Sequence, residues 1–337
     1  MTAALGERRL RISFAGAGTI SLFHLTGWQQ TPNVEVVAIC DPILEKAQAR
    51  AAAFGIPKIY TDFSEMLERE RPDAVDIATP VATHAPLTRI AADHGVHVMC
   101  QKPLTPTVAE AERLIRDVGE RVRFMVHENF RFRPQYLEAR RWIVEGRLGE
   151  VRHARLAVRG GGMLSLAGGT PALLQRQPYL QAFPRLIIFE LLIHHLDVLR
   201  SLLGSLTVRS VQIGRVNPTL AGEDVAVIVL SGSGDLTCVL DGNMSAAGYP
   251  ALSVDRLELM GRKGTLLFDT DRLCMVGSGE PAITYDLQKG YQACFTRAIQ
   301  EFVGGLRTGE PFPTDRLDNL ETLKLMESCY LAAGISG

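Results

Sequence analysis

Along the first 127 residues, short apolar runs alternate with longer amphipathic segments. The apolar runs are the length of buried strands, and the amphipathic segments have the spacing of helices that cover a sheet. Strand and helix in alternation are typical of a doubly wound, mostly parallel sheet with helices on both faces. The predicted strands are Ile12–Ala15, Glu35–Cys40, Lys58–Tyr60, Ala74–Ala78, His97–Cys100 and Arg123–His127, and the predicted helices include Leu44–Phe54, Ser64–Arg69, His84–His94 and Val108–Val118.

The pattern changes near Pro134, where a helix at Pro134–Glu145 is followed by a turn at Gly146–Val151 that enters a strand, and later by a helix around Pro184–Leu203. Beyond it, apolar and polar residues alternate, which predicts an antiparallel sheet with one face solvated or covered by a partner. We therefore expect a first domain over residues 1–128 and an α+β domain over 129–337 with a large open sheet, whose last helix could pack back on the first domain. Its predicted strands are Val208–Val216, Val225–Ser231, Leu236–Met244, Val254–Gly261 and Thr265–Asp269, and its closing helices are Tyr291–Leu306 and Leu317–Ala332.

The stretch from Gly160 to Pro184 has little regular pattern and is long for a loop inside a compact domain. Loops of this length often serve as lids or binding loops. Arg176, Tyr179 and Arg185 are its candidates for contacting a substrate, although a purely structural excursion fits the pattern as well.

A strand, a glycine turn and a helix follow one another at the start of the chain. Gly16-Ala17-Gly18 directly follows the first strand, and a helix is expected from Thr19 onward. Backbone amides and a helix N-terminus then meet at one point, which suits a diphosphate. Asp41 ends the next strand. A carboxylate at this position accepts hydrogen bonds from the ribose hydroxyls of a dinucleotide and repels a 2′-phosphate. This pattern predicts NAD in preference to NADP, the alternative being a strand–helix–strand unit that binds nothing.

Composition excludes several other classes of protein. The net charge of −1 over 337 residues gives no general attraction to nucleic acid or to an acidic membrane. The six cysteines have no zinc-like spacing, and reduced thiols in a cytoplasmic protein account for them. The N-terminal residues lack the apolar stretch of a signal peptide, and the apolar run at 186–203 is interrupted by charges. We expect a cytoplasmic protein with no metal, membrane or nucleic-acid partner.

Two groups of polar residues follow strands of the first domain, at the rim where ligands of such sheets bind. Lys102, in Gln101-Lys102-Pro103, follows a buried strand and is suited to proton transfer or to polarising a hydroxyl. The alternative is a surface lysine in a loop. Asn129 can donate to and accept from a substrate hydroxyl, whereas Arg131 could contact substrate or tie the domains together.

A third group lies on the helix predicted around Pro184–Leu203. Residues three, four and seven apart share a helix face, so Glu190, His194 and Asp197 line up, and His195 lies to one side. A histidine beside carboxylates is a good general acid or base. A buried, hydrogen-bonded core histidine is the alternative, and it suits His195 better than His194. A metal site from these residues has no third histidine to support it.

Seven blocks in order resemble the glucose–fructose oxidoreductase, inositol dehydrogenase and MocA (Gfo/Idh/MocA) family. They are AGAGTISLFH at 15–24, CDP at 40–42, ATPVATH at 78–84, QKP at 101–103, ENFRFRP at 128–134, GRLGEV at 146–151 and the helix with Glu190, His194 and Asp197. The resemblance covers almost the whole chain. It implies a Rossmann domain, an α+β domain whose open sheet forms a homodimer or homotetramer, and NAD(P)-dependent hydride transfer on a sugar, cyclitol or related polyol.

The resemblance also implies a catalytic set of Lys102, Glu190 and His194. The chain has Gln101, Glu190 and Leu192 where the family commonly has Glu, Asp and Gly. Together, the residues and the resemblance predict cofactor contacts from Gly16, Gly18, Thr19, Ile20, Asp41, Thr79, Pro80, His84, Gln101 and Lys102, and substrate contacts from Asn129, Arg131, Tyr179 and Asp197.

The mechanism we expect is proton removal from a secondary alcohol by His194 while the hydride passes to nicotinamide. Lys102 hydrogen-bonds the same oxygen, and Glu190 orients His194 or holds a neighbouring hydroxyl. Two other functions remain open on the same scaffold. One is a glycosidase that uses bound NAD for a transient oxidation, and the other is a non-catalytic regulator that binds a dinucleotide.

Overall fold

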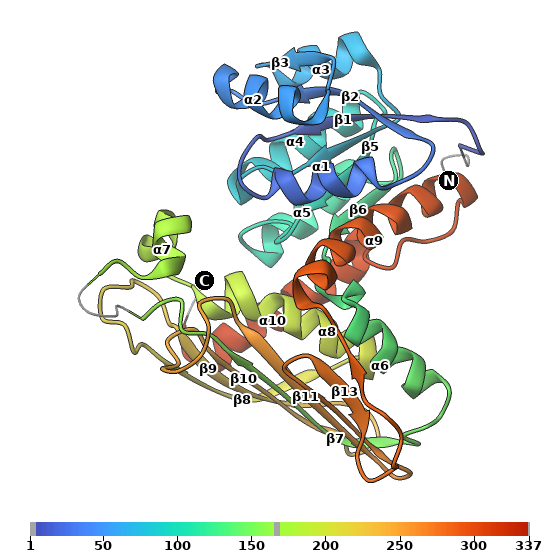
Figure 1. Cartoon of the computed structure of the whole chain (residues 1–337). Helices are drawn as coiled ribbons and strands as arrows, with labels where there is room; N and C mark the ends of the chain where they lie inside the picture. The colour runs from blue at the N-terminus through green and yellow to red at the C-terminus, as the bar shows by residue number, and fades with distance from the viewer. Residues whose placement is uncertain (1–4, 165–168, 336–337) are drawn as a thin grey trace. The chain divides into compact units, whose positions relative to one another are not determined.

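The computed structural model describes residues 5–164 and 169–335, and its contacts divide the chain into two units (Figure 1). The first unit comprises the described residues through Phe132 together with Gln288–Leu323. The second comprises Arg133–Leu287 and the described residues from Lys324 onward. None of the helices in the described ranges is long and apolar enough to cross a membrane.

The first unit is built on a six-stranded sheet in the order β3-β2-β1-β4-β5-β6, with every pair parallel. This confirms the predicted doubly wound sheet. The strand order reverses direction between β1 and β4, which is where ligands of such sheets bind. The strands are β1 (Leu10–Ala15), β2 (Val34–Cys40), β3 (Lys58–Tyr60), β4 (Ala74–Ile77), β5 (His97–Gln101) and β6 (Phe124–His127).

Helices connect these strands in the alternating way that the sequence predicts. Two of them, α2 and α5, have the predicted bounds, because a glycine directly follows each last turn. The first helix begins at Ser21, two residues later than expected, since the backbone turns once more after the glycines. The helices are α1 (Ser21–Gln29), α2 (Leu44–Phe54), α3 (Phe63–Glu70), α4 (Val81–Asp93), α5 (Val108–Val118) and the 3₁₀ turn η1 (Phe130–Phe132).

Helix α9 (Leu287–Thr308) completes the core of the first unit, although it lies 160 residues beyond the last strand of that unit's sheet. Its buried face includes Phe295 and Phe302, which pack in the same cluster as Phe14 and Trp28. Periodicity predicts that such a helix is amphipathic, but a sequence pattern does not say which sheet it will cover.

The second unit is built on an eight-stranded sheet in the order β14-β13-β12-β11-β7-β10-β9-β8. Its pairs are antiparallel except β7 with β10, so the predicted, mostly antiparallel sheet is confirmed. The strands are β7 (Val151–Arg159), β8 (Thr207–Gly214), β9 (Val225–Ser231), β10 (Thr237–Asn243), β11 (Val254–Gly261), β12 (Thr265–Asp269), β13 (Arg272–Met275) and β14 (Ile283–Thr284).

One face of this sheet is buried and the other is open. Along β9, Ala226, Ile228 and Leu230 are buried, and the residues between them are partly or fully exposed. The segments α6 (Pro134–Val144) and α8 (Ile193–Leu203) lie over the buried face (Figure 1). The eight-stranded sheet therefore has one covered and one open face, as the alternating sequence pattern predicts.

Three predictions for the second half of the chain need correction. The helix predicted around Pro184–Leu203 is a π-helix, η4 (Ile187–Leu192), followed by α8. The loop predicted from Gly160 to Pro184 contains α7 (Ala172–Arg176) and the 3₁₀ helix η3 (Pro178–Ala182), while residues 165–168 lie outside the described ranges. These helices are shorter than the window in which periodicity can be recognised.

The third correction concerns α10 (Arg316–Ala332), for which the sequence suggested one apolar side from Leu317 to Tyr330. Leu323, Met326 and Tyr330 are buried, but Leu317 is 53% exposed. Steps of three residues drift backward around a 3.6-residue helix, so the first residue of the series leaves the buried side.

The packing of α9 against α1 can be tested at Gly27, because a methyl group there would lie 2.6 Å from Ile299 Cδ1 and 3.3 Å from Thr296 Cα. Gly304 lies within α9 with open space around it and is a matched control. Both Gly→Ala changes gain about 1 kcal/mol of helix propensity. We expect Gly304→Ala to raise the free energy of unfolding. The free energy of unfolding of Gly27→Ala should be about 1–3 kcal/mol lower than that of Gly304→Ala, because the added methyl group overpacks the contact. Equal values from urea denaturation would contradict this packing.

Candidate functional site

The turn between β1 and α1 is held by backbone contacts that only glycine permits. Gly16 has φ +103°, and its amide donates to Cys40 O at 2.8 Å. A Cβ at this position would lie 2.4 Å from Ala78 O. Gly18 differs, because nothing lies within 4 Å of the place where its Cβ would be. Gly16 therefore allows the turn to lie close to the Ala78 carbonyl after β4, and Gly18 leaves open space above the turn.

Asp41 links the end of β2 to this turn. Its Oδ2 accepts a hydrogen bond from Ala17 N at 2.7 Å, and its Oδ1 accepts from Ile43 N at 2.9 Å. A carboxylate has about four acceptor positions, so these two amides leave others for hydroxyl donors. The predicted ribose-binding carboxylate thus lies directly beside the predicted phosphate-binding turn.

Arg50 also contacts this turn, although it was not among the residues predicted from the sequence. Its guanidinium lies on α2 and donates to Gly18 O at 3.2 Å and, more weakly, to Ala17 O at 3.4 Å. Burial lowers the pKa of Arg50 from its usual value. The signal available in the sequence was a lone arginine next to Ala47 and Ala51, the two buried positions of α2.

The loops that follow β4 and β5 are joined by His84. Its Nε2 lies 2.9 Å from Thr79 O, and its Nδ1 lies 2.9 Å from Pro103 O. Burial lowers the pKa of His84 below its ordinary value, against smaller opposing effects of the backbone carbonyls. His84 therefore holds together the two loops that carry Thr79, Pro80, Gln101 and Lys102. Lys102 itself is half-buried.

Asn129 and Arg131 occupy positions inside the first unit. Asn129 is buried, and its Nδ2 lies 3.1 Å from Cys294 Sγ. Arg131 donates to Pro313 O at 2.7 Å and to Asp318 at 2.8 Å. Arg131 thus ties the segment after β6 to Pro313 and to the first turn of α10, and both partners belong to the first unit. These contacts are a link inside one unit, not the link between domains that the sequence left open.

In the second unit, Glu190 belongs to η4, and both His194 and Asp197 belong to α8. Glu190 is partly exposed, His194 is 7% exposed, and Asp197 is completely buried. π-Helical turns are rare and occur frequently at functional sites. The predicted acid–base residues therefore lie on either side of a change from π- to α-helical geometry.

The start of η4 is capped by residues from distant parts of the second unit. Glu223 Oε1 accepts from Leu186 N at 3.1 Å and from Ile188 N at 3.3 Å, and the Tyr330 hydroxyl donates to it at 2.7 Å. Burial and the charge of Glu223 raise the pKa of Tyr330 well above its usual value. A carboxylate at a helix N-terminus is the expected partner for unpaired amides.

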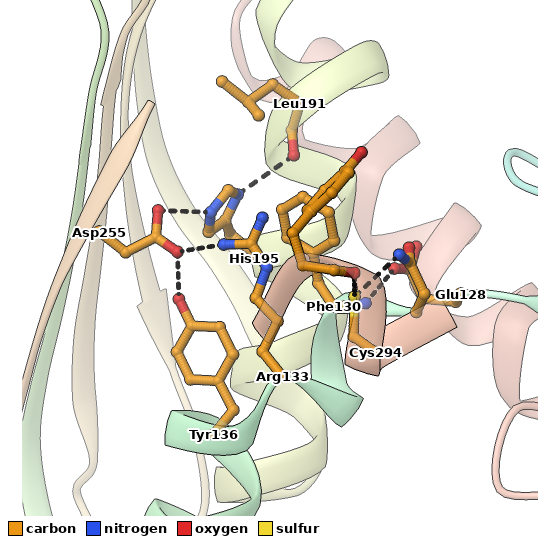
Figure 2. Close-up of polar contacts among 10 residues, drawn as sticks. Glu128, Phe130, Arg133, Tyr136, Leu191, His195, Asp255 and Cys294 are labelled. Carbon is orange, nitrogen blue, oxygen red and sulfur yellow. Dashed lines mark hydrogen bonds and ion pairs between the residues drawn. The ribbon is translucent and has the colours of Figure 1, made fainter. Parts of the chain in front are cut away.

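His195 is the buried core histidine that the sequence suggested. Its Nε2 lies 3.1 Å from Asp255 Oδ1 and its Nδ1 lies 3.1 Å from Leu191 O. Figure 2 shows both contacts. Asp255 Oδ2 accepts from the Tyr136 hydroxyl at 2.7 Å and from Arg133 at 2.9 Å (Figure 2). These contacts fix the ring of His195 and, through Leu191, the backbone between Glu190 and His194.

The charge on Asp255 is stabilised by its neighbours. Burial alone would raise the pKa of this carboxyl, but the charges of His195 and Arg133 and the Tyr136 hydrogen bond lower it well below its usual value. Asp255 was not among the residues predicted from the sequence. Its signal was a carboxylate at an inward position of an alternating strand, in register with Leu257 and Leu259.

Tyr179, which the sequence offered as a substrate contact, lies within electrostatic range of Glu190. Partial burial, followed by the charge of Glu190, raises the pKa of Tyr179 to about 12, against a smaller effect of Arg176. The charges of Glu190 on η4 and of Arg176 on α7 thus both act on the Tyr179 phenol. Arg185, the third candidate, instead lies over the Tyr330 ring at 4.3 Å.

No cluster of three or more His, Cys, Asp or Glu side chains in the described part of the chain could hold a metal ion.

The geometry defines a two-unit protein with a Rossmann-type first unit. Residues 10–128 match the model of the oxidoreductase family with an NAD-binding Rossmann fold, and residues 136–267 match the GFO/IDH/MocA C-terminal domain. The chain belongs to the Gfo/Idh/MocA oxidoreductase family.

The chain is similar to D-apiose dehydrogenase of Paraburkholderia graminis, with 33% identity over 97% of this chain and 88% of that protein. It is 28% identical to inositol 2-dehydrogenase 4 of Saccharopolyspora erythraea, over 90% of this chain and 88% of that protein. A crystal structure of an oxidoreductase from Agrobacterium radiobacter with NAD+, L-tartaric acid and magnesium has a TM-score of 0.88 and 28% identity, and covers 97% of this chain and 96% of that one.

The residues of the first unit fit an NAD molecule. The space over Gly18 and the N-terminus of α1 suits a pyrophosphate, and Asp41 beside them suits an unphosphorylated ribose. Arg50 adds a positive charge next to the same turn.

The two glycines of the turn make separable predictions. Gly16→Ala should lower the free energy of unfolding by about 1–3 kcal/mol, because its methyl group collides with the Ala78 carbonyl. Gly18→Ala should change it by less than about 0.5 kcal/mol, yet weaken NAD binding about tenfold by blocking one amide contact. Urea denaturation and calorimetric titration measure the two effects. NAD binding by Gly18→Ala equal to that of the wild type would remove the pyrophosphate from this turn.

The pairing of Asp255 makes a prediction about stability and pH. Asp255→Asn leaves His195 and Arg133 without their carboxylate and should cost about 3–5 kcal/mol of unfolding free energy at pH 7. Because the folded pKa of Asp255 lies below the unfolded value of 3.8, its contribution is present above about pH 4 and is lost as the pH falls further.

Asp235→Asn is the matched control, since Asp235 is exposed and should change the free energy of unfolding by less than about 0.5 kcal/mol. Urea denaturation at pH 7, 5 and 3.5 measures these differences. A gap between wild type and Asp255→Asn that widens below pH 4 has the wrong sign and would contradict this account.

Proposed function

We propose that this protein is an NAD-dependent dehydrogenase that moves a hydride between a secondary alcohol of a sugar, cyclitol or related polyol and nicotinamide. The observation that carries the proposal is that one chain combines a glycine turn beside Asp41 with Lys102 after β5 and a Glu190/His194 pair on a π-to-α helix. The names of the D-apiose and inositol dehydrogenase relatives support a polyhydroxylated substrate.

Each proposed catalytic residue has a role that follows from its chemistry. His194 removes the hydroxyl proton, since imidazole titrates near neutral pH. Lys102 donates a hydrogen bond to the same oxygen and stabilises the negative charge that develops on it. Glu190 orients His194 or accepts a hydrogen bond from a neighbouring hydroxyl of the substrate. Bound NAD supplies the hydride acceptor at C4 of its nicotinamide ring.

The substrate-binding surface that we propose includes Tyr179, because its phenol lies within electrostatic range of Glu190. A phenol and a carboxylate bind hydroxyl groups as donor and acceptor. We propose that Asn129, Arg131 and Asp197 support the substrate-binding surface, because all three have largely buried side chains. They shape the segments that carry the reacting groups.

The function is tested by following nicotinamide absorbance with a panel of aldoses, cyclitols and sugar acids, with NAD and NADP in parallel. We expect NADH formation with at least one of these compounds and a lower rate with NADP, because Asp41 repels a 2′-phosphate. Release of an aglycone without net NADH would instead indicate the NAD-using glycosidase. Dinucleotide binding without turnover on the whole panel would indicate a regulator.

We also propose that the protein works as a homodimer or homotetramer in the cytoplasm. The open face of the eight-stranded sheet exposes apolar side chains, among them Val227 and Met260, and a second copy could cover them. All six cysteines are unpaired thiols, as expected in a reducing compartment.

His194→Ala should lower kcat by about 10²-fold or more through loss of the general base, with the Kd for NAD unchanged. His94→Ala is the control, because His94 is an exposed histidine at the end of α4. Steady-state kinetics and calorimetric NAD titration measure the two quantities. A kcat within twofold of wild type in His194→Ala would exclude His194 as the base.

A further inference from the structure

A line of buried polar side chains runs through the first unit from β4 to the backbone of Lys102. Asp76 Oδ2 lies 2.8 Å from His24 Nδ1 and 2.7 Å from Trp28 Nε1. His24 Nε2 lies 3.0 Å from the side-chain nitrogen of Gln101. Gln101 Oε1 lies 2.6 Å from Lys102 N. Asp76 and His24 are completely buried, and Gln101 is 8% exposed.

The direction of every hydrogen bond in this line follows from one fixed donor. The amide of Lys102 can only donate, so the Gln101 atom beside it is the carbonyl oxygen. The Gln101 NH₂ group therefore faces His24, and because it only donates, His24 Nε2 is the acceptor and carries no proton. The ring then has its proton on Nδ1 and donates to Asp76 Oδ2. His24 is thus a neutral ring of one defined tautomer.

We infer that Gln101 is a positioning residue for Lys102, held in place by His24 and Asp76. The inference rests on the proposed function, in which Lys102 contacts the reacting oxygen. Gln101 accepts from the Lys102 amide with its carbonyl oxygen and donates to His24 with its NH₂ group, so one side chain makes both contacts. The line also fixes the Lys102 amide, and with it the direction in which that side chain leaves the strand.

A glutamate at position 101 would change the proton count of this line. Its carboxylate could accept from Lys102 N, but its second oxygen could not donate to His24 Nε2. With both carboxyl groups ionised, a doubly protonated His24 between Asp76 and the new carboxylate satisfies both contacts. A methionine, similar in length, would break the contacts with His24 and with Lys102 N.

The surroundings of His24 limit what else could change its protonation. The ring of His127 lies with its centroid 4.1 Å from that of His24. Phe14 and Phe295 also border the ring, at 6.0 Å and 5.4 Å. Cys100 lies close enough to Asp76 for that charge to add to burial in raising the thiol's pKa. Asp76 and His127 are thus ionisable groups in direct contact with the His24 ring, and Cys100 faces Asp76.

The proton positions are tested by solid-state ¹⁵N spectra of the full-length protein with labelled histidines. In wild type at pH 7, His24 should give one protonated and one unprotonated nitrogen, with the proton on Nδ1. In Gln101→Glu both nitrogens should be protonated. The chain has eight histidines, so His24→Gln assigns the signals by loss, and the signal that changes in Gln101→Glu assigns them independently. A wild-type His24 that is protonated on Nε2 overturns the inference.

The positioning role is tested by kinetics of Gln101→Met and Gln101→Glu. We expect Gln101→Met to lower kcat by about 10- to 100-fold through displacement of Lys102, with the KM for NAD unchanged. Gln101→Glu should recover most of the wild-type kcat, because it restores the contact with Lys102 N. Gln29→Met, at an exposed position of the helix that carries His24, is the matched control and should behave as wild type.

Each other outcome has a clear meaning. A Gln101→Met protein with wild-type kcat overturns the positioning role, and a raised KM for NAD with unchanged kcat assigns the side chain to the cofactor instead. If Gln101→Met does not fold, the spectra of wild type and Gln101→Glu still decide the proton positions. The spectra do not depend on turnover. Absence of dehydrogenase activity would therefore contradict the proposed function, and the spectra would still test the proton positions at His24.

Discussion

The contact between Asp41 and the amide of Ala17 is the interaction on which the first unit's site depends. One carboxylate accepts from the glycine turn with one oxygen and from Ile43 with the other, so it ties the end of β2 to the loop after β1. This holds the space over Gly18 and the carboxylate that we propose as the ribose acceptor in one place. The same charge that orders the loop disfavours a 2′-phosphate, and cofactor preference therefore follows from a structural contact.

The second unit also contains buried carboxylates that accept hydrogen bonds from backbone or side-chain donors of several segments. Glu223 caps the π-helix at Leu186 and Ile188, and Asp255 holds the His195 ring. Both residues come from the sheet or its connections, and both act on the helix that carries Glu190 and His194. A change in helix geometry needs outside support, because a π-turn leaves amides without their usual partners.

Much of the fold could be predicted because the signals were local. Strands such as Lys58–Tyr60 and Val225–Ser231, and helices such as Leu44–Phe54, have the predicted bounds, since glycines and alternation mark their ends. The glycine turn and Asp41 could be proposed as a cofactor site for the same reason. Asp255 and Arg50 were missed because each acts on residues far away in the chain. The π-helix was missed because no local pattern distinguishes it from an α-helix before the capping carboxylate is known.

The most direct test of this account is a crystal structure of the protein with NAD and a substrate polyol. The account predicts the pyrophosphate on the amides between Gly16 and Ser21, the adenosine ribose on Asp41, and Lys102 and His194 within hydrogen-bonding reach of one substrate oxygen. A dinucleotide bound elsewhere, or a nicotinamide ring remote from both side chains, would contradict it.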